Sequence, residues 1–133
     1  MNVRLSKVRL NGKLRILGSK SFAHRLLLAS YLSNSICQVD NVPNSKDIEA
    51  TISCIEAMGG VVTKNNSCYT IKSKDLINHN NQVILNCNES GSTLRFLIPI
   101  ALTRFSKIKV IGTKKLISRG IEEYETIFKK FQK

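Results

Sequence analysis

The hydrophobic and polar positions of this chain predict strands and helices in alternation. Apolar and basic residues alternate on both sides of Asn11-Gly12, a two-residue turn signal, which predicts a β-hairpin over residues 3–17. Residues 20–32 follow a helical pattern. The expected apolar face of this helix comprises Phe22, Leu26, Ala29, and Leu32 or Ser33. A short strand over residues 36–42 follows.

The next stretch predicts a second helix and a second hairpin. Asn44-Ser45 can cap a helix whose first turn carries two carboxylates, and Gly59-Gly60 ends that helix. Its apolar stripe comprises Ile48, Ile52, Ile55 and Met58. The strands of the hairpin lie near residues 61–62 and 68–71. The element order to this point is therefore β-α-β-α-β-β.

After a polar connector over residues 72–81, the pattern restarts. The expected elements are a strand over 83–85, a helix over 91–103, a strand over 108–111 and a helix over 121–131. The apolar side of the last helix comprises Ile121, Tyr124, Phe128 and Phe131. At an offset of about 70 residues, Arg25 falls on Arg95, and apolar residues follow both. We expect an α/β (α+β) fold of repeated βαβαββ units, of which this chain holds about one and two-thirds.

The composition is that of a soluble globular protein with an excess of positive charge. Of the 133 residues 42% are apolar, and no apolar run approaches the roughly 20 residues that span a bilayer. The first residues also lack the apolar stretch of a signal peptide. We expect a cytoplasmic protein with no membrane partner. The net charge of +12 favours anionic ligands, such as nucleic acid or a phosphorylated metabolite, although it also fits a solvated basic surface.

The cysteines and histidines predict no metal site. The four cysteines form no C-x-x-C pair, and the two histidines complete no zinc pattern. We expect four free thiols that fill the interior as small apolar residues. His24 is expected to pack or to lie on the surface rather than act as a catalytic base, and His79 falls in the polar connector.

The first loop-to-helix junction carries candidate chemistry in residues 18–21. A glycine turn precedes a helix N-terminus flanked by hydroxyls and by Lys20, and such an N-terminus binds anions. Ser21 and Arg25 lie four residues apart, so they share one helix face. An arginine there can hold a carboxylate or a phosphate through two parallel hydrogen bonds.

The second junction, residues 89–93, has the same character. Gly91 has no side chain, so a ligand can approach the backbone closely, and Arg95 follows at the i+4 position. Either junction alone could be an ordinary capped helix with one surface arginine. Their occurrence at matching positions of a repeat favours an anion-binding site.

At these two junctions the chain resembles a known enzyme family. The segment GSKSFAHRLLLASYL, from residue 18, resembles the opening signature of the 5-enolpyruvylshikimate-3-phosphate synthases. NESGSTLRFLIPIAL, from residue 88, resembles their second signature. PNSKDIEATISCIEAMGG resembles the intervening helix, and KKLISRGIEEY resembles a later segment less closely. The resemblance runs essentially from end to end of the chain.

The resemblance implies a fold of two domains, each built from three βαβαββ units, with the active site in the cleft between them. It implies transfer of the enolpyruvyl group of phosphoenolpyruvate to the 5-hydroxyl of shikimate 3-phosphate, with release of phosphate and without a metal or organic cofactor. Residues 1–17 would pair with the second domain, and residues 18–133 would form part of the first. In this N-terminal part alone, the hairpin is expected to pack irregularly or to pair with a second copy.

The family's substrate contacts fall on both junctions. Lys20 would contact both substrates, and Ser21 and Arg25 would hold the shikimate moiety. Gly91 would lie against phosphoenolpyruvate. Lys115 stands where the family has an arginine that binds phosphoenolpyruvate, so the charge is kept and the bidentate fork is lost. The supporting residues are Ser90, Ser92, Thr93, Arg95 and Arg119.

Some family features are replaced or fall outside the chain. Ser118 and Gly120 replace the acidic residue and the proline that usually surround Arg119, and Glu89 stands where an asparagine is common. The proton-transfer carboxylate and lysine of the family lie beyond residue 133. We therefore expect no catalytic residue in this chain and no turnover by the chain alone.

Three other functions remain open on the sequence. The related UDP-N-acetylglucosamine enolpyruvyl transferase has Lys-Asn at Lys20-Ser21 and usually a cysteine within the loop at 112–119, and this chain has neither. A small basic nucleic-acid-binding module would suit the charge, but the aromatic residues fall mostly on apolar helix faces rather than on a stacking surface. A stand-alone or pseudoenzyme domain is the third alternative.

Overall fold

The computed structural model describes residues 3–4, 6–7, 9, 11–14, 16–33, 35–73 and 82–131, the last without its side chain. The elements are α1 (Lys20–Leu32), β1 (Ile36–Val39), α2 (Lys46–Ala57), β2 (Val61–Asn65), β3 (Cys68–Lys72), β4 (Gln82–Asn88), α3 (Gly91–Leu102), β5 (Lys107–Gly112), α4 (Lys114–Ile117) and α5 (Glu122–Phe131). The mixed α and β class is confirmed. Most of the connector and His79 lie outside the described residues.

The strands form two small sheets. In the first sheet the order is β1-β3-β2, and both outer strands run antiparallel to β3. In the second sheet β4 and β5 pair directly and run parallel. Parallel neighbours need a crossover connection, and α3 provides it.

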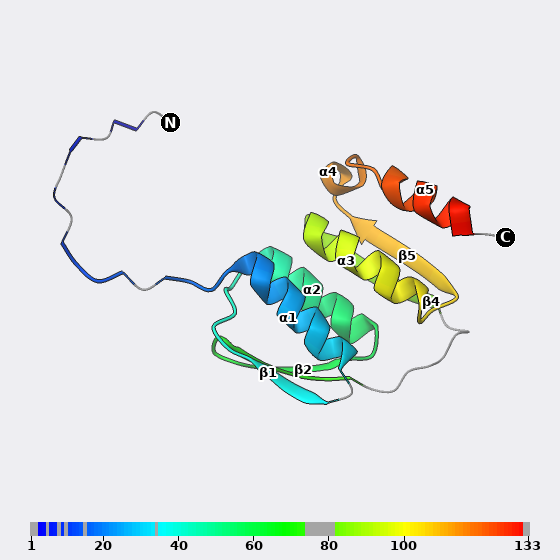
Figure 1. Ribbon diagram of the computed structural model, residues 1–133, viewed down its shortest axis with the longest axis horizontal. Coiled ribbons are helices and arrows are strands. Elements are labelled where there is room, and N and C mark those ends of the chain that lie inside the picture. The colour runs from blue at the N-terminus through cyan, green and yellow to red at the C-terminus, as the bar shows by residue number, and fades with distance from the viewer. Residues whose placement is uncertain are drawn as a thin grey trace.

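The helices lie between and beside these sheets (Figure 1). α1 packs on β1 and β3, whereas α2 packs on β2 and β4 and so joins the two sheets. α3 packs against α2, β4 and β5. A single apolar core runs through these layers, with Leu27, Ile55, Ile71, Leu85 and Leu97 fully buried.

Local sequence signals explain the ends of α2. The Ser45 hydroxyl accepts a hydrogen bond from the backbone N–H of Ile48, and Asp47 and Glu49 lie in the first turn, where negative charge favours a helix. At the other end Gly59 has φ of 90°, a left-handed conformation that glycine adopts without steric cost. The predicted cap and stop of this helix are confirmed.

The predicted N-terminal hairpin is not formed in the described part of residues 3–17, which contains no strand. Val3, Leu14, Ile16 and Leu17 are 69% to 88% exposed. A two-stranded hairpin needs a third strand or a helix to cover its apolar face, and the described chain offers none. Leu5, Val8 and Leu10 lie outside the described residues.

The predicted apolar face of α1 is wrong. Phe22 is 61% exposed, Leu26 is 37% exposed, and Leu32 is 45% exposed. The buried positions are Ala23, His24, Leu27, Leu28, Ser30 and Tyr31. Because α1 carries apolar residues on both sides, its periodicity did not decide which side packs; contacts with α2 and the first sheet decide it.

The repeat seen in the sequence recurs in the burial of α1 and α3. Thr93, Leu94, Leu97, Ile98 and Ala101 are buried in α3. At an offset of 70 these positions fall on Ala23, His24, Leu27, Leu28 and Tyr31, all of them buried in α1. The two helices therefore present equivalent faces to the core, as expected for copies of one unit. The number of units stays a prediction.

Candidate functional site

The N-terminal ends of α1, α2 and α3 meet at one end of the molecule (Figure 1). Lys20 at the start of α1 forms a 2.6 Å ion pair with Asp47 at the start of α2. The carbonyl of Asp47 lies 3.3 Å from Oγ1 of Thr93 in α3. Each helix N-terminus carries about half a positive charge and several free N–H groups. Three such ends together make this region attractive to anions.

The α1 junction presents side chains. Ser19 caps the helix by accepting a hydrogen bond from the N–H of Phe22. Arg25 donates to the carbonyl of Ser21 at 2.9 Å, so the two residues do share a face. The Arg25 guanidinium also lies 5.4 Å from the centre of the Phe96 ring on α3, within the range of a cation–π contact. Arg25 therefore links the start of α1 to α3.

The α3 junction presents backbone and two arginines. The buried Ser90 caps this helix by accepting from the N–H of Thr93 at 3.2 Å. A Cβ atom placed on Gly91 would lie 3.3 Å from Nη1 of Arg119 and 3.6 Å from Nη1 of Arg95. Both guanidinium groups thus converge on the glycine, and a Cβ atom at this position would lie tightly against Arg119 and in ordinary contact with Arg95. Such a pair of arginines suits a phosphate or a carboxylate.

The remaining predicted residues lie on the surface of this region. Ser92 is exposed in the first turn of α3, and Glu89 is exposed just before it. Lys115 is exposed on α4, next to Leu116, which is buried and reaches the Gly91 position. The four-residue helix α4, which the sequence pattern did not predict, brings Arg119 back to α3. Thr113 caps it by accepting from the N–H of Leu116.

A buried polar chain behind the junctions was missed on the sequence. Nδ1 of His24 lies 2.7 Å from Oγ1 of Thr51, which lies 2.7 Å from Oγ1 of Thr93. Thr93 Oγ1 in turn donates to Ser90 Oγ at 2.6 Å. Burial lowers the pKa of His24; Asp47 raises it, and Lys20 and Arg25 lower it further. The only sequence signal for these hydrogen bonds was the position of His24 in the helix that follows the first junction.

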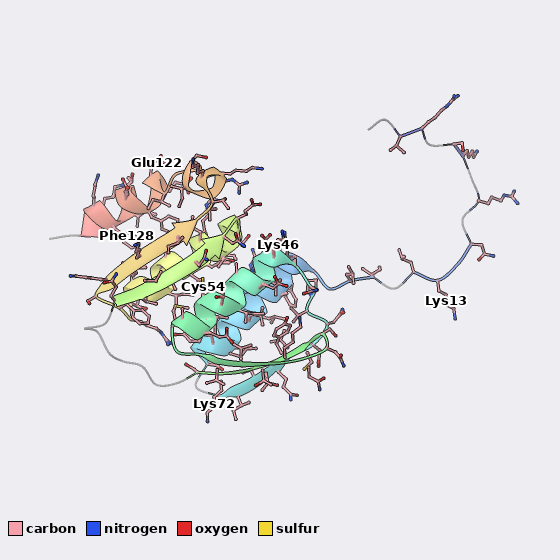
Figure 2. All side chains as sticks on the ribbon, turned by 180° about the vertical axis from the view of Figure 1, so that it is seen from behind. Lys13, Lys46, Cys54, Lys72, Glu122 and Phe128 are labelled. Carbon is pink, nitrogen blue, oxygen red and sulfur yellow. The ribbon has the colours of Figure 1, made fainter. Side chains whose placement is uncertain are left out.

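Other hollows and reactive groups suit an anionic ligand less well. A groove of about 350 Å³ lies between α3, β5 and α5, but most of its lining is aliphatic or aromatic, including Ile108, Val110, Tyr124 and Phe128. Figure 2 shows Phe128 on α5, away from Lys46 at the start of α2. All four cysteines are free, and within the described residues no group of histidine, cysteine and carboxylate side chains could hold a metal. None of the described helices is long and apolar enough to cross a membrane.

Comparison with known proteins matches nearly the whole chain to one enzyme family. The family model of EPSP synthase (3-phosphoshikimate 1-carboxyvinyltransferase) matches residues 5–131. A 3-phosphoshikimate 1-carboxyvinyltransferase from Clostridium kluyveri is 37% identical over 96% of this chain and 30% of its own length. The enzyme of that name from Clostridioides difficile is 38% identical over 90% of this chain and 30% of its own length.

A solved structure of EPSP synthase from Acinetobacter baumannii has the same fold over 86% of this chain and 26% of that chain, with a TM-score of 0.70 and 22% identity. This chain therefore spans about 30% of the length of the curated relatives it matches. The family match covers both helix junctions and the α4 segment that returns Arg119 to Gly91. This chain belongs to the EPSP synthase (3-phosphoshikimate 1-carboxyvinyltransferase) family.

Proposed function

We propose that this chain provides an anion-binding wall of an enolpyruvyl transferase that joins phosphoenolpyruvate to shikimate 3-phosphate in the cytoplasm. The observation that carries the proposal is the meeting of three helix N-termini beside Arg95 and Arg119, whose guanidinium groups converge on Gly91. Both substrates carry a phosphate and a carboxylate, so several anionic groups have to be held at once. Helix N-termini and arginine forks are the groups that do this best.

The proposed roles follow from the position of each residue. Gly91 lets phosphoenolpyruvate approach the N–H groups of α3, and Arg119 and Arg95 hold its anionic groups. Lys20 extends toward both substrates, while Ser21 and Arg25 hold the shikimate moiety. Lys115 adds charge from α4, and Ser90, Ser92 and Thr93 shape the first turn of α3. The family match favours this reading over a UDP-amino-sugar substrate and over a nucleic-acid-binding module.

The rest of the chemistry is proposed to need other parts of the enzyme. Proton transfer requires positioned acid and base groups. The cations and hydroxyls of this wall bind anions but do not form a paired-carboxylate site. We expect no phosphate release from phosphoenolpyruvate and shikimate 3-phosphate by this chain alone. Residues 1–17 are proposed to form a hairpin with a second domain or, without one, with a second copy of the chain.

Titration of the ¹⁵N-labelled chain with phosphoenolpyruvate tests the wall directly. We expect amide shifts at residues 91–93 and weak affinity, with a dissociation constant of about 1 mM or above, since one wall supplies only some of the contacts. Arg119→Gln should weaken binding about threefold to tenfold through loss of a bidentate partner. Lys72→Gln changes the charge equally at a site away from the helix N-termini (Figure 2) and should bind as the unmodified chain.

Two results would contradict the proposal. One is an absence of shifts at residues 91–93 at the highest soluble ligand concentration. The other is equal weakening by Arg119→Gln and Lys72→Gln, which would indicate attraction by net charge rather than a built site.

A further inference from the structure

A buried chain of hydrogen bonds links the N-terminal halves of three helices. It runs from His24 on α1 through Thr51 on α2 to Thr93 on α3, with steps of 2.7 Å, and ends on the cap residue Ser90 at 2.6 Å. All four side chains are at most 2% exposed. Its first two steps join residues 27 and 42 positions apart in the sequence, so they are tertiary links, and only the last step, from Thr93 to Ser90, is local.

The hydroxyls of this chain can all donate in one direction. Each threonine has a single hydroxyl proton, and His24 can donate from Nδ1 to Thr51. Thr51 can then donate to Thr93, 2.7 Å away, and Thr93 to Ser90, 2.6 Å away. Both threonines also lie within 3.3 Å of the Asp47 carbonyl. A buried chain of this kind is stronger than its separate bonds because each bond polarises the next.

Packing alone does not account for a histidine at this position. His24 Nε2 is buried without a hydrogen-bond partner among the described residues. An unsatisfied buried polar atom is destabilising, a cost that a leucine of similar size would avoid. The equivalent position on α3, residue 94, is in fact a leucine. What the histidine adds is its bond to Thr51.

We propose that Thr51 is a positioning residue that holds the two anion-binding junctions in register through His24, Thr93 and Ser90. The inference rests on the proposed function, since it explains how that wall is kept in shape. Thr51 is fully buried and reaches the second junction only through the buried Thr93, and its hydroxyl is the step between α1 and α3 in this hydrogen-bond chain. Without it the first turn of α3 can shift relative to Lys20 and Arg25. A ligand that bridges both junctions then meets a mismatched pair, and small misplacements of binding groups are costly.

Isosteric replacement separates the hydroxyl from the packing. Thr51→Val removes the hydroxyl with little change in size, whereas Thr51→Ser keeps it. Thr126→Val is a control for the loss of a threonine hydroxyl, because Thr126 also lies close to the carbonyl four residues earlier in its helix but is exposed and outside the hydrogen-bond chain. The probe is inorganic phosphate, followed by amide shifts at residues 19–21 and 91–93. Melting curves report whether each variant is folded.

The expected result is a loss of phosphate affinity at residues 91–93 of at least threefold in Thr51→Val. The affinity of Thr51→Ser and of Thr126→Val should stay within about twofold of that of the unmodified protein, because the hydrogen-bond chain from His24 to Ser90 is intact in both. Unchanged affinity in Thr51→Val would overturn the inference. Equal loss in Thr51→Ser would also overturn it, because packing and not the hydroxyl would then be the cause.

A second measurement needs no ligand. The ¹⁵N signals of the His24 ring are compared between the unmodified chain and Thr93→Val, which removes a hydroxyl two steps away without touching the ring. A shift of the Nδ1 signal supports coupling through the hydrogen bonds from Thr93 to His24. An unchanged signal would overturn the proposed role of Thr51. If the unmodified chain fails to bind phosphate, the anion-site proposal fails by itself, and this ring signal alone decides the inference.

Discussion

The two helix junctions hold the same repeat position but differ in what they expose. At α1 the cap residue Ser19 and the following Lys20 and Ser21 are all exposed, and side chains are available for a ligand. At α3 the cap residue Ser90 is buried, and the first turn offers a glycine beneath two arginine groups. One copy of the unit thus provides flexible side chains, and the other provides fixed backbone donors.

This difference shows how a repeat can make a site that neither copy makes alone. The buried faces of α1 and α3 agree position by position, so the core constrains both copies in the same way. The starts of the two helices do not share this agreement, because the cap residue Ser19 is exposed and the cap residue Ser90 is buried. The equivalence of the two cores and the divergence of the two junctions can be tested separately.

The largest expected effect concerns the shared core. Leu27 and Leu97 occupy equivalent positions and are both fully buried, so Leu27→Ala and Leu97→Ala should each lower the free energy of unfolding by about 2–5 kcal/mol. Leu26→Ala, one position away and 37% exposed, should cost much less than either. Urea denaturation measures all three. Similar losses for Leu26 and Leu27 would show that the originally predicted face of α1 is buried after all.

The two glycines of the junctions should respond differently to alanine. A Cβ atom on Gly18 would clash with the backbone carbonyl of Asn41, so Gly18→Ala should destabilise by about 1–3 kcal/mol. At Gly91 the nearest atom is the mobile end of Arg119, so Gly91→Ala should leave stability within about 0.5 kcal/mol. It should nevertheless weaken phosphate binding. Thermal melts measure the stability of both variants, and phosphate titration measures their binding. A stability loss in Gly91→Ala as large as in Gly18→Ala would contradict the expected difference.

The two caps provide a smaller contrast. Ser90 accepts from both the N–H and the hydroxyl of Thr93, and Ser90→Ala should cost about 1–2 kcal/mol. Ser19 is exposed and its bond to Phe22 N–H is long, at 3.4 Å, so Ser19→Ala should cost about 0.5 kcal/mol. Urea denaturation measures the difference. Equal losses would mean that burial of the α3 cap adds nothing.

The smallest expected effect is a pH dependence that only the α1 copy can show. Burial holds the pKa of His24 below 6.5, so below that pH the unfolded chain binds more protons than the folded one. Stability contributed by neutral His24 is therefore complete above pH 6.5 and falls as the pH drops toward the folded-state pKa. The slope for one proton stays below about 1.4 kcal/mol per pH unit.

His24→Asn removes this titration while leaving the carboxylates in place. The difference in unfolding free energy between the two proteins should therefore change between pH 7 and pH 5. A constant difference across that range would show that His24 titrates alike in the folded and unfolded chain.

The success of prediction from sequence depended on how local each feature is. The cap of α2 at Ser45 and its stop at Gly59 are set by neighbouring residues, and both were predicted. The face of α1 was not, because both sides of that helix are apolar and tertiary contacts choose between them. The N-terminal hairpin is not formed in the described residues for a related reason. Its turn signal is local, but a two-stranded hairpin is stable only when a third strand or a helix packs on it.

The candidate site divides in the same way. Lys20, Ser21, Arg25 and Gly91 follow from motifs at the starts of helices. The meeting of Thr51 with Thr93 depends on how α2 packs against α3, over 42 residues of separation. The four-residue helix α4 is too short for a periodic pattern, so the path that brings Arg119 to Gly91 was not visible either.

The ion pair between Lys20 and Asp47 makes selectivity a property of the unliganded molecule. The carboxylate already holds the lysine at 2.6 Å, so in the proposed site an incoming anion competes with an internal one for that contact. A monovalent ion such as chloride exchanges one weak partner for another and gains little. A ligand with two or more negative charges keeps the neighbouring arginines as well, so its advantage survives the exchange. In the proposed site, the resident carboxylate would thus favour ligands with several negative charges over small common anions.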